Sequence, residues 1–143
     1  MDADRTKMIL FRTLRLAPAY LRCDYPAFVR HVYVTGLERD PEPGITMTPP
    51  TSSEDVYENR VRYIGSVLGS DEIQSRGYTA MVYAIPDMLG SNDRQGVAQM
   101  VRHVFPTAEE LLSGVGALMD HVCENSRRQD MLLATVATAG RTC

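Results

Sequence analysis

The histidines and cysteines are the residues of this chain best suited to nucleophilic catalysis or metal binding. His121 and Cys123 lie two positions apart on a predicted helix, a spacing that matches no zinc-ligand pattern. The remaining histidines, His31 and His103, fall on two other predicted helices, so the sequence brings no nucleophile and base together. We therefore expect a protein that is not an enzyme and that binds no metal and no cofactor.

The segment 90–96, Gly-Ser-Asn-Asp-Arg-Gln-Gly, is a second candidate for chemistry. It resembles a phosphate-binding loop only in its glycines, because the lysine and the Ser or Thr that follow it in such loops are absent. The same segment opens a predicted helix over 93–105, whose apolar residues stand at i, i+3, i+4 and i+7: Val97, Met100, Val101 and Val104. We expect Asn92 or Asp93 to cap this helix. Arg94 then lies at its polar start, within reach of an acidic group on a partner, although an ordinary core helix with a solvated first turn explains the same residues.

Length and composition limit the classes of protein. A chain of 143 residues and 15.9 kDa fits one domain, and 44% hydrophobic and 23% charged residues are typical of globular proteins. The net charge of −3 argues against a nucleic-acid partner. No apolar run approaches the roughly 20 residues of a membrane-spanning helix. The odd number of cysteines and the lack of a secretory signal predict free thiols in a reducing compartment.

Apolar residues recur at helical spacing along most of the chain, which predicts an all-α fold. The expected helices begin and end at about these residues: 4–16, 24–36, 55–68, 78–85, 93–105, 107–123 and 128–138. The segment 39–53 contains four prolines and no periodic apolar positions, so we expect a mobile loop there. Only Val32-Tyr-Val-Thr has enough β propensity to form a strand instead.

Two segments resemble sequence motifs of the Bcl-2 family of apoptosis regulators, in particular its small viral members. The segment 61–68, Val-Arg-Tyr-Ile-Gly-Ser-Val-Leu, is similar to the third homology motif of that family, with Ser66 where an Asp is usual. The segment 90–98 resembles the first homology motif, whose core is Asn-Trp-Gly-Arg followed by an apolar pair. Here the Trp is missing, and the Arg and the Gly appear in altered order. The order of the helices and the long loop after the first of them are also similar to that family.

This resemblance implies one helical domain over 1–143, in which a bundle surrounds a central apolar hairpin of the helices 93–105 and 107–123. The helices 55–68 and 78–85 would form the walls of a surface groove. It further implies an anti-apoptotic protein that sequesters the amphipathic death-motif helix of pro-apoptotic partners. Arg94 would pair with the acidic residue of that helix. The groove residues expected on this basis are Leu68, Met81, Ile85, Met88, Asn92, Arg94, Gly96, Val97 and Val101.

The implied location is the cytoplasm of a host cell, with recruitment to mitochondria through partners. An empty apolar groove would also favour a homodimer. One alternative is a helical DNA-binding transcriptional regulator, in which 78–85 and 93–105 form a helix-turn-helix and Arg94, Gln95, Gln99 and Arg102 face the bases. The acidic net charge weakens this alternative. A second alternative, for the apolar groove residues, is that they simply form the core.

Overall fold

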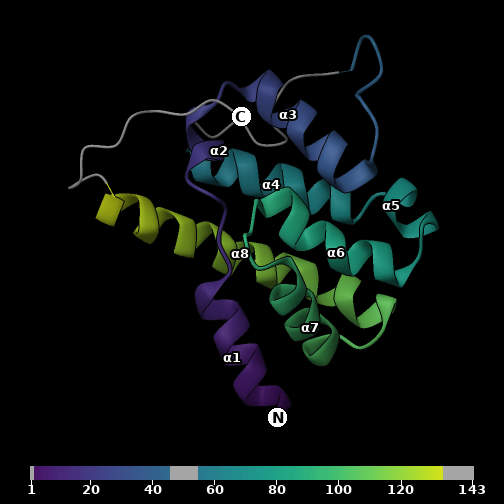
Figure 1. Ribbon diagram of the computed structural model, residues 1–143, viewed down its shortest axis with the longest axis vertical. Coiled ribbons are helices and arrows are strands. Elements are labelled where there is room, and N and C mark those ends of the chain that lie inside the picture. Colours follow the sequence, from purple (N-terminus) through teal and green to yellow (C-terminus); the bar gives the residue numbers. More distant parts are fainter. Residues whose placement is uncertain (1, 46–54, 134–143) are drawn as a thin grey trace.

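The computed structural model describes residues 2–45 and 55–133, and helices make up nearly all of their regular structure (Figure 1). In chain order the elements are α1 (Ala3–Thr13), α2 (Ala19–Arg22), α3 (Tyr25–Val32), the π-helix η1 (Tyr33–Leu37), α4 (Val56–Leu68), α5 (Asp71–Ser75), α6 (Tyr78–Leu89), α7 (Arg94–Val104) and α8 (Ala108–Leu133). No strand occurs within the described ranges, so the all-α prediction is confirmed, and the segment 32–35 is helical. Residues 39–45 form no helix, whereas the larger part of the expected loop lies outside the described residues.

Side-chain caps explain where several helices begin. Asp24 accepts a hydrogen bond from the backbone N–H of Ala27 at the start of α3, and Asp55 does the same for two N–H groups of α4. Asp93 caps α7 by accepting from Gly96, as one of the two predicted alternatives. The first helix is capped by Asp2 instead of Asp4, and it ends at Thr13 because the backbone is extended at Leu14.

The last helix differs most from the prediction. We expected separate helices over 107–123 and 128–138, but α8 runs without a break from Ala108 to Leu133. Asn125 and Ser126, whose residue types favour helix ends, are buried against the end of α1. The Asn125 side-chain amide donates to the carbonyls of Phe11 and Leu14, at 2.9 Å each, and the Ser126 hydroxyl accepts from the Leu16 N–H at 2.9 Å. These two polar residues therefore attach α1 to α8 instead of ending a helix.

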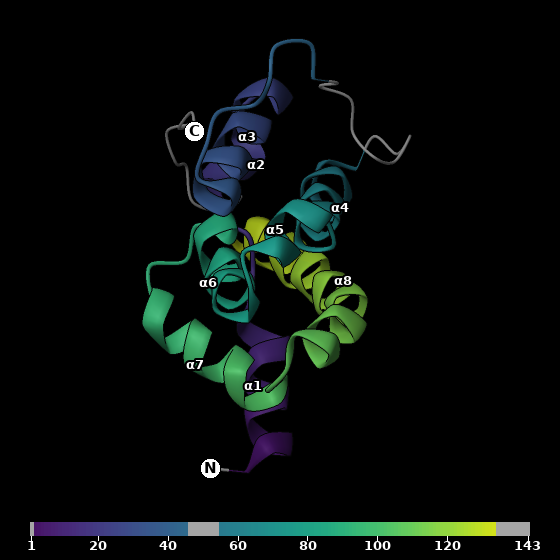
Figure 2. The same cartoon turned by 90° about the vertical axis from the view of Figure 1, so that its right-hand side faces the viewer.

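The packing of the helices corrects the predicted central hairpin. Helix α8 packs mainly against α4 and α1, whereas α7 packs mainly against α1 and α6, and the two helices diverge (Figure 2). Among the described α-helices, α6 has the largest buried fraction, and its buried residues are Met81, Val82, Ala84, Ile85, Pro86, Met88 and Leu89. Helix α6 is mainly apolar and has one charged residue, Asp87, whereas α7 carries Arg94, Gln95, Gln99 and Arg102, which require solvent. The centre of the bundle is thus α6.

Glycines allow two close contacts around this core. A Cβ added at Gly65 would lie 3.2 Å from the Cγ of Met119, so the small residue lets α4 approach α8. A Cβ at Gly114 would collide with the ring of Phe105. The buried hydrophobic residues of all these helices form one core cluster.

The prediction of free cysteines holds for Cys123 but not for Cys23. Cys123 is a free, buried thiol, as expected, but Cys23 is disulfide-bonded. The free thiol expected at Cys23 is therefore not found. Among the described helices, none combines the length and the apolar character that crossing a bilayer requires.

Candidate functional site

The six apolar residues predicted to line a groove are buried. Each has 7% or less of its surface exposed: Leu68, Met81, Ile85, Met88, Val97 and Val101. They belong to the core cluster because α4 and α7 both pack against α6 and close the seams between these helices. Their burial favours the interpretation of these residues as core, and of the six only Val97 also borders one of the surface hollows described below.

Asn92 and Gly96, which are also predicted groove residues, lie in the turn before α7 and in its first helical turn. Asn92 and Val97 line a hollow of about 420 Å³ between the end of α1 and this turn, beside Thr13, Ala17 and Met100. Gly96 lies against the carboxylate of Asp93 and donates its N–H to that side chain at 3.1 Å. A Cβ at this position would collide with the carboxylate, so Gly96 serves the helix cap.

Arg94 does not line the hollow at Asn92, and its side chain contacts Asp87 and Tyr83 of α6 instead. Its side chain is 52% exposed, and its Nε donates to Oδ1 of Asp87 at 2.8 Å. The guanidinium carbon lies 4.3 Å from the centre of the Tyr83 ring, within the range of a cation–π contact. The hydrogen bond from Arg94 to Asp87 raises the pKa of the guanidinium. Arg94 is thus a fixed cation that remains open to solvent on one side.

A second hollow, of about 360 Å³, lies beside Arg94 between η1 and α6. It is lined by Thr35, Gly36, Glu38, Arg76, Thr79, Ala80, Tyr83, Ala84, Asp87 and Arg94. Gly36, Ala80 and Ala84 supply small residues to this lining, and the charged side chains include two of each sign. Ala80, Ala84 and Asp87 stand at i, i+4 and i+7 on α6, a spacing that places them on one face. This spacing of small residues is a signal that the sequence prediction missed, because the apolar residues Met81 and Ile85 stand on a different face of the same helix.

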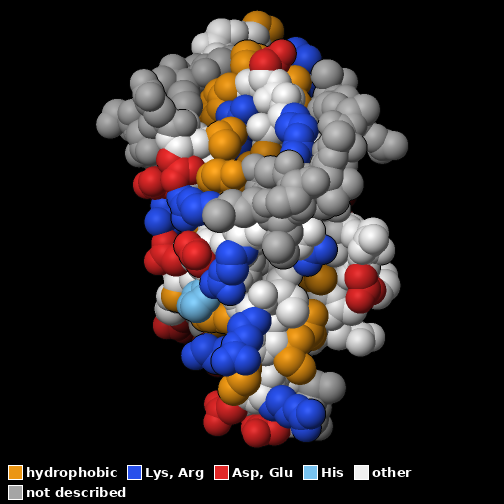
Figure 3. Space-filling model, turned by 90° about the vertical axis from the view of Figure 1, so that its left-hand side faces the viewer, with side chains coloured by type: hydrophobic (Ala, Val, Ile, Leu, Met, Phe, Trp, Pro, Cys, Tyr) orange, Lys and Arg blue, Asp and Glu red, His pale blue; other side chains and the backbone are white. Residues whose placement is uncertain are grey.

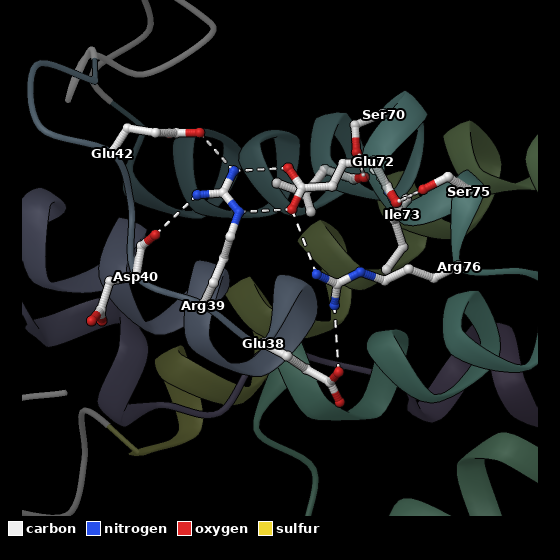
Figure 4. A network of polar contacts seen from close by, with 10 residues as sticks. Glu38, Arg39, Asp40, Glu42, Ser70, Glu72, Ile73, Ser75 and Arg76 are labelled. Carbon is white, nitrogen blue, oxygen red and sulfur yellow. Dashed lines mark hydrogen bonds and ion pairs between the residues drawn. The ribbon is translucent and has the colours of Figure 1, made fainter.

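One wall of this hollow is fixed by a network of ion pairs (Figure 4). Arg39 donates to both carboxylate oxygens of Glu72, at 2.8 Å each, and to Glu42 at 2.8 Å. Arg76 lies 3.6 Å from Glu72 and 3.5 Å from Glu38. The hydrogen bonds from Arg39 lower the pKa of the Glu72 carboxyl. Because Glu38 and Arg76 also line the hollow, the network attaches the segment after η1 to α5 at its edge.

Arg94, Gln95 and Arg102, three of the four polar residues of α7 that the DNA-binding alternative requires, contact α6. Tyr83 donates its hydroxyl to Oε1 of Gln95 at 2.9 Å. The guanidinium of Arg102 lies 5.7 Å from the centre of the Tyr83 ring and donates to the hydroxyl of Thr79 at 3.4 Å. These contacts hold the side chains along the α6 surface, and they give no support to a helix that reads bases in a groove.

His121 and Cys123, the pair closest to a catalytic or metal-binding spacing in the sequence, do not form a reactive site. The ring of His121 lies 4.8 Å from that of Phe11, centre to centre. Burial raises the pKa of the Cys123 thiol, which disfavours the nucleophilic thiolate. In the part of the chain that the structure describes, no group of three or more His, Cys, Asp or Glu side chains gathers in a way that could hold a metal ion.

Comparisons with protein-family models, with curated proteins and with solved structures find no match for this chain. The geometry of the hollow beside Arg94 is therefore the basis for a functional proposal.

Proposed function

We propose that this chain is an anti-apoptotic regulator, of the kind that its resemblance to the Bcl-2 family implies, which captures the amphipathic helix of a pro-apoptotic partner. The hollow between η1 and α6 receives the part of that helix that carries its acidic residue. The observation that supports this proposal is Arg94, a half-exposed cation held at the rim of a hollow with small residues in its lining. Regulators of this kind bind an apolar helix face and one carboxylate together.

The contacts of Arg94 prepare it for such a ligand. Its stacking on Tyr83 restricts the side chain before binding, which reduces the entropy lost on complex formation. Asp87 holds the guanidinium by one hydrogen bond from Nε, so other N–H groups remain for an incoming carboxylate. Gly36, Ala80 and Ala84 leave space for an apolar ligand side chain one helical turn away.

The buried groove residues add a condition to the proposal. The apolar stripe of Met81, Ile85 and Val101 lies beneath the surface, whereas the hollow beside Arg94 is open. A ligand that also covers this stripe must separate α6 from a neighbouring helix. The opening of a packed seam exposes apolar surface, and this cost lowers the affinity. We therefore expect binding that is accompanied by a change in the packing of α6.

Removal of Arg94 tests the proposal. Isothermal titration calorimetry with a panel of pro-apoptotic amphipathic helical peptides should show measurable binding of at least one peptide to the unchanged protein. Arg94→Ala should weaken that binding by about tenfold or more, because truncating one partner of a desolvated charge pair costs about 2–5 kcal/mol.

Arg62→Ala is the matched control. Arg62 forms a similar exposed ion pair, with Asp120 at 2.5 Å, but it lies on α4 and outside the hollow. The control should leave peptide affinity unchanged. Equal effects of the two substitutions would contradict the role of Arg94, and a panel without any binder would contradict the proposed function itself.

A further inference from the structure

The outer face of α1 combines positive charge with exposed apolar side chains. Arg5, Met8, Ile9 and Arg12 stand at i, i+3, i+4 and i+7, the spacing of one helix face. Met8 is 52% exposed and Ile9 is 41% exposed, and they are two of the three large hydrophobic residues exposed in the described ranges. Both arginines are exposed as well. We call these four residues the α1 stripe.

The α1 stripe does not face the rest of the bundle. Thr6 and Leu10, on the opposite side of the helix, are buried, and α1 packs against α7 and α8. The buried Asn125 and Ser126 additionally hold the end of α1 by three hydrogen bonds. Helix α1 is therefore fixed on its inner side, and the stripe has no partner within the described part of the chain.

Helix α1 lies at one end of the molecule and projects from the bundle (Figures 1 and 2). A space-filling view shows basic and hydrophobic side chains side by side over this end (Figure 3). Because the stripe lies on a convex, projecting helix, a flat surface can approach it without meeting the rest of the bundle.

We propose that the α1 stripe binds the surface of a membrane that contains anionic lipids. Met8 and Ile9 would enter the boundary between headgroups and acyl chains, while Arg5 and Arg12 beside them would bind lipid phosphates. This arrangement needs neither a spanning helix nor a pocket. It goes beyond capture of a helix, because it gives the protein a direct route to a membrane, independent of the hollow at Arg94.

Charge and shape favour a lipid surface over a protein partner. A second copy that packed stripe to stripe would set the arginines of both copies against each other, and like charges in contact destabilise an interface. A partner helix would need pockets for its anchoring side chains, but the hollows near Asn92 and Arg94 contain none of the four stripe residues. Two apolar side chains are also too few for the core of a stable protein interface.

The acidic net charge of the chain limits which part of the protein could be attracted to an anionic surface. At a net charge of −3 the protein as a whole is repelled by an anionic surface, so attraction must come from a local patch. Lys7 and Arg15 add two more cations to the first 16 residues, against Asp2 and Asp4 at the start of α1. Binding should therefore depend on this end of the molecule and weaken as salt is added.

Vesicle co-sedimentation of the full chain tests the proposal. We expect binding to vesicles of phosphatidylcholine with phosphatidylserine and no binding to phosphatidylcholine alone. Arg12→Glu should weaken binding by about twentyfold, because each unit of charge near an anionic surface contributes about fivefold. Met8→Gln combined with Ile9→Gln should weaken it by about tenfold or more, since the apolar anchor is lost while the charge is kept.

Arg30→Glu is the charge-matched control. Arg30 is exposed on α3, at the opposite end of the molecule from α1, and its replacement changes the net charge by the same amount as Arg12→Glu. The proposal requires that Arg30→Glu retain most of the binding and that all variants keep their unfolding temperature. Equal losses for Arg12→Glu and Arg30→Glu, or no binding to anionic vesicles, would overturn it.

Two other outcomes would assign the stripe to a different occupant and so overturn the proposal. One is a dimer in analytical ultracentrifugation that Met8→Gln with Ile9→Gln abolishes. The other is binding of a soluble acidic helical peptide that Arg12→Glu abolishes, without binding to vesicles. Peptide capture at Arg94 is measured separately, so failure of either proposal leaves the other open to its own test.

Discussion

Asp87 holds Arg94 where the carboxylate of a ligand helix would hold it in the proposed complex. The two side chains form an exposed ion pair, with Asp87 26% exposed and Arg94 52% exposed. Such pairs contribute about 0.2–1 kcal/mol, which is small compared with a desolvated pair in an interface. Asp87 therefore competes with an acidic ligand without preventing its binding.

Asp87→Asn should strengthen binding of an acidic helical peptide by about twofold to fivefold, because the ligand no longer displaces an internal carboxylate. Calorimetry on the variant and on the unchanged protein measures the difference. Asp120→Asn removes a comparable carboxylate, the partner of Arg62, and should have no effect. Weaker binding of the Asp87 variant would show that this carboxylate takes part in holding the ligand.

The sequence predicted part of this site at the level of single residues. The exposure of Arg94 at the polar start of a helix and the cap at Asp93 follow from local residue types, and both are found. The contacts of Arg94 with Tyr83 and Asp87 could not be predicted in this way. They depend on how α7 crosses α6, which is determined by the packing of the whole bundle.

Helix α8 shows how tertiary contacts override local signals. Asn125 and Ser126 favour a helix end by residue type, but their side chains bond to the backbone of residues 11–16, more than 100 positions away. The helix therefore continues through them. The predicted break failed because no local pattern shows where a distant backbone will lie.

Two glycines of α8 provide a matched test of such contacts. Gly114→Ala should destabilise the protein by about 1–3 kcal/mol, because the new methyl group collides with the ring of Phe105 in a packed core. Gly116→Ala should stabilise it by up to about 1 kcal/mol, since nothing lies within 4 Å of the new Cβ and Ala favours the helix. Urea denaturation measures both. Effects of the same sign would contradict the placement of Phe105 over Gly114.

At the scale of the whole molecule the predicted fold class is found, whereas the predicted arrangement of the helices is not. The helical periods predicted an all-α chain, and one core cluster is found in the described residues. The central position was assigned to the wrong helices, because α7 and α8 were compared with a family pattern. The burial of most of α6 follows from its own sequence, which has only one charged residue in twelve.

The stability of the molecule should decrease in mild acid because of His31. Its ring lies 4.0 Å from that of Tyr20, centre to centre, and its Nε2 is buried without a hydrogen-bond partner. Burial lowers the pKa of His31 below the ordinary value of 6.5, and a hydrogen bond with the Met88 backbone opposes this effect in part. As the pH drops below that value, the unfolded chain binds a proton at this histidine that the folded protein does not bind. The free energy of unfolding therefore decreases as the pH decreases.

His31→Gln should remove this part of the pH dependence. Urea denaturation between pH 7 and pH 5 measures the free energy of unfolding of both proteins, and the unchanged protein should show the steeper decrease. His103→Gln, a substitution at an exposed position on α7, should keep the steeper decrease. The same slope for His31→Gln and the unchanged protein would exclude His31 as the cause.

The π-helix η1 makes the hollow beside Arg94 sensitive to the number of residues between positions 33 and 37. A π-helical turn contains about one residue more than an α-helical turn, so it has the geometry of a single-residue insertion between residues 33 and 37. Deletion of one residue there would rotate everything after it by about 100° around the helix axis. Gly36 would then lose its close contact with the side chain of Met88, and Arg39 would lose its hydrogen bonds with Glu72. The hollow beside Arg94 thus depends on the number of residues in this segment as much as on their types.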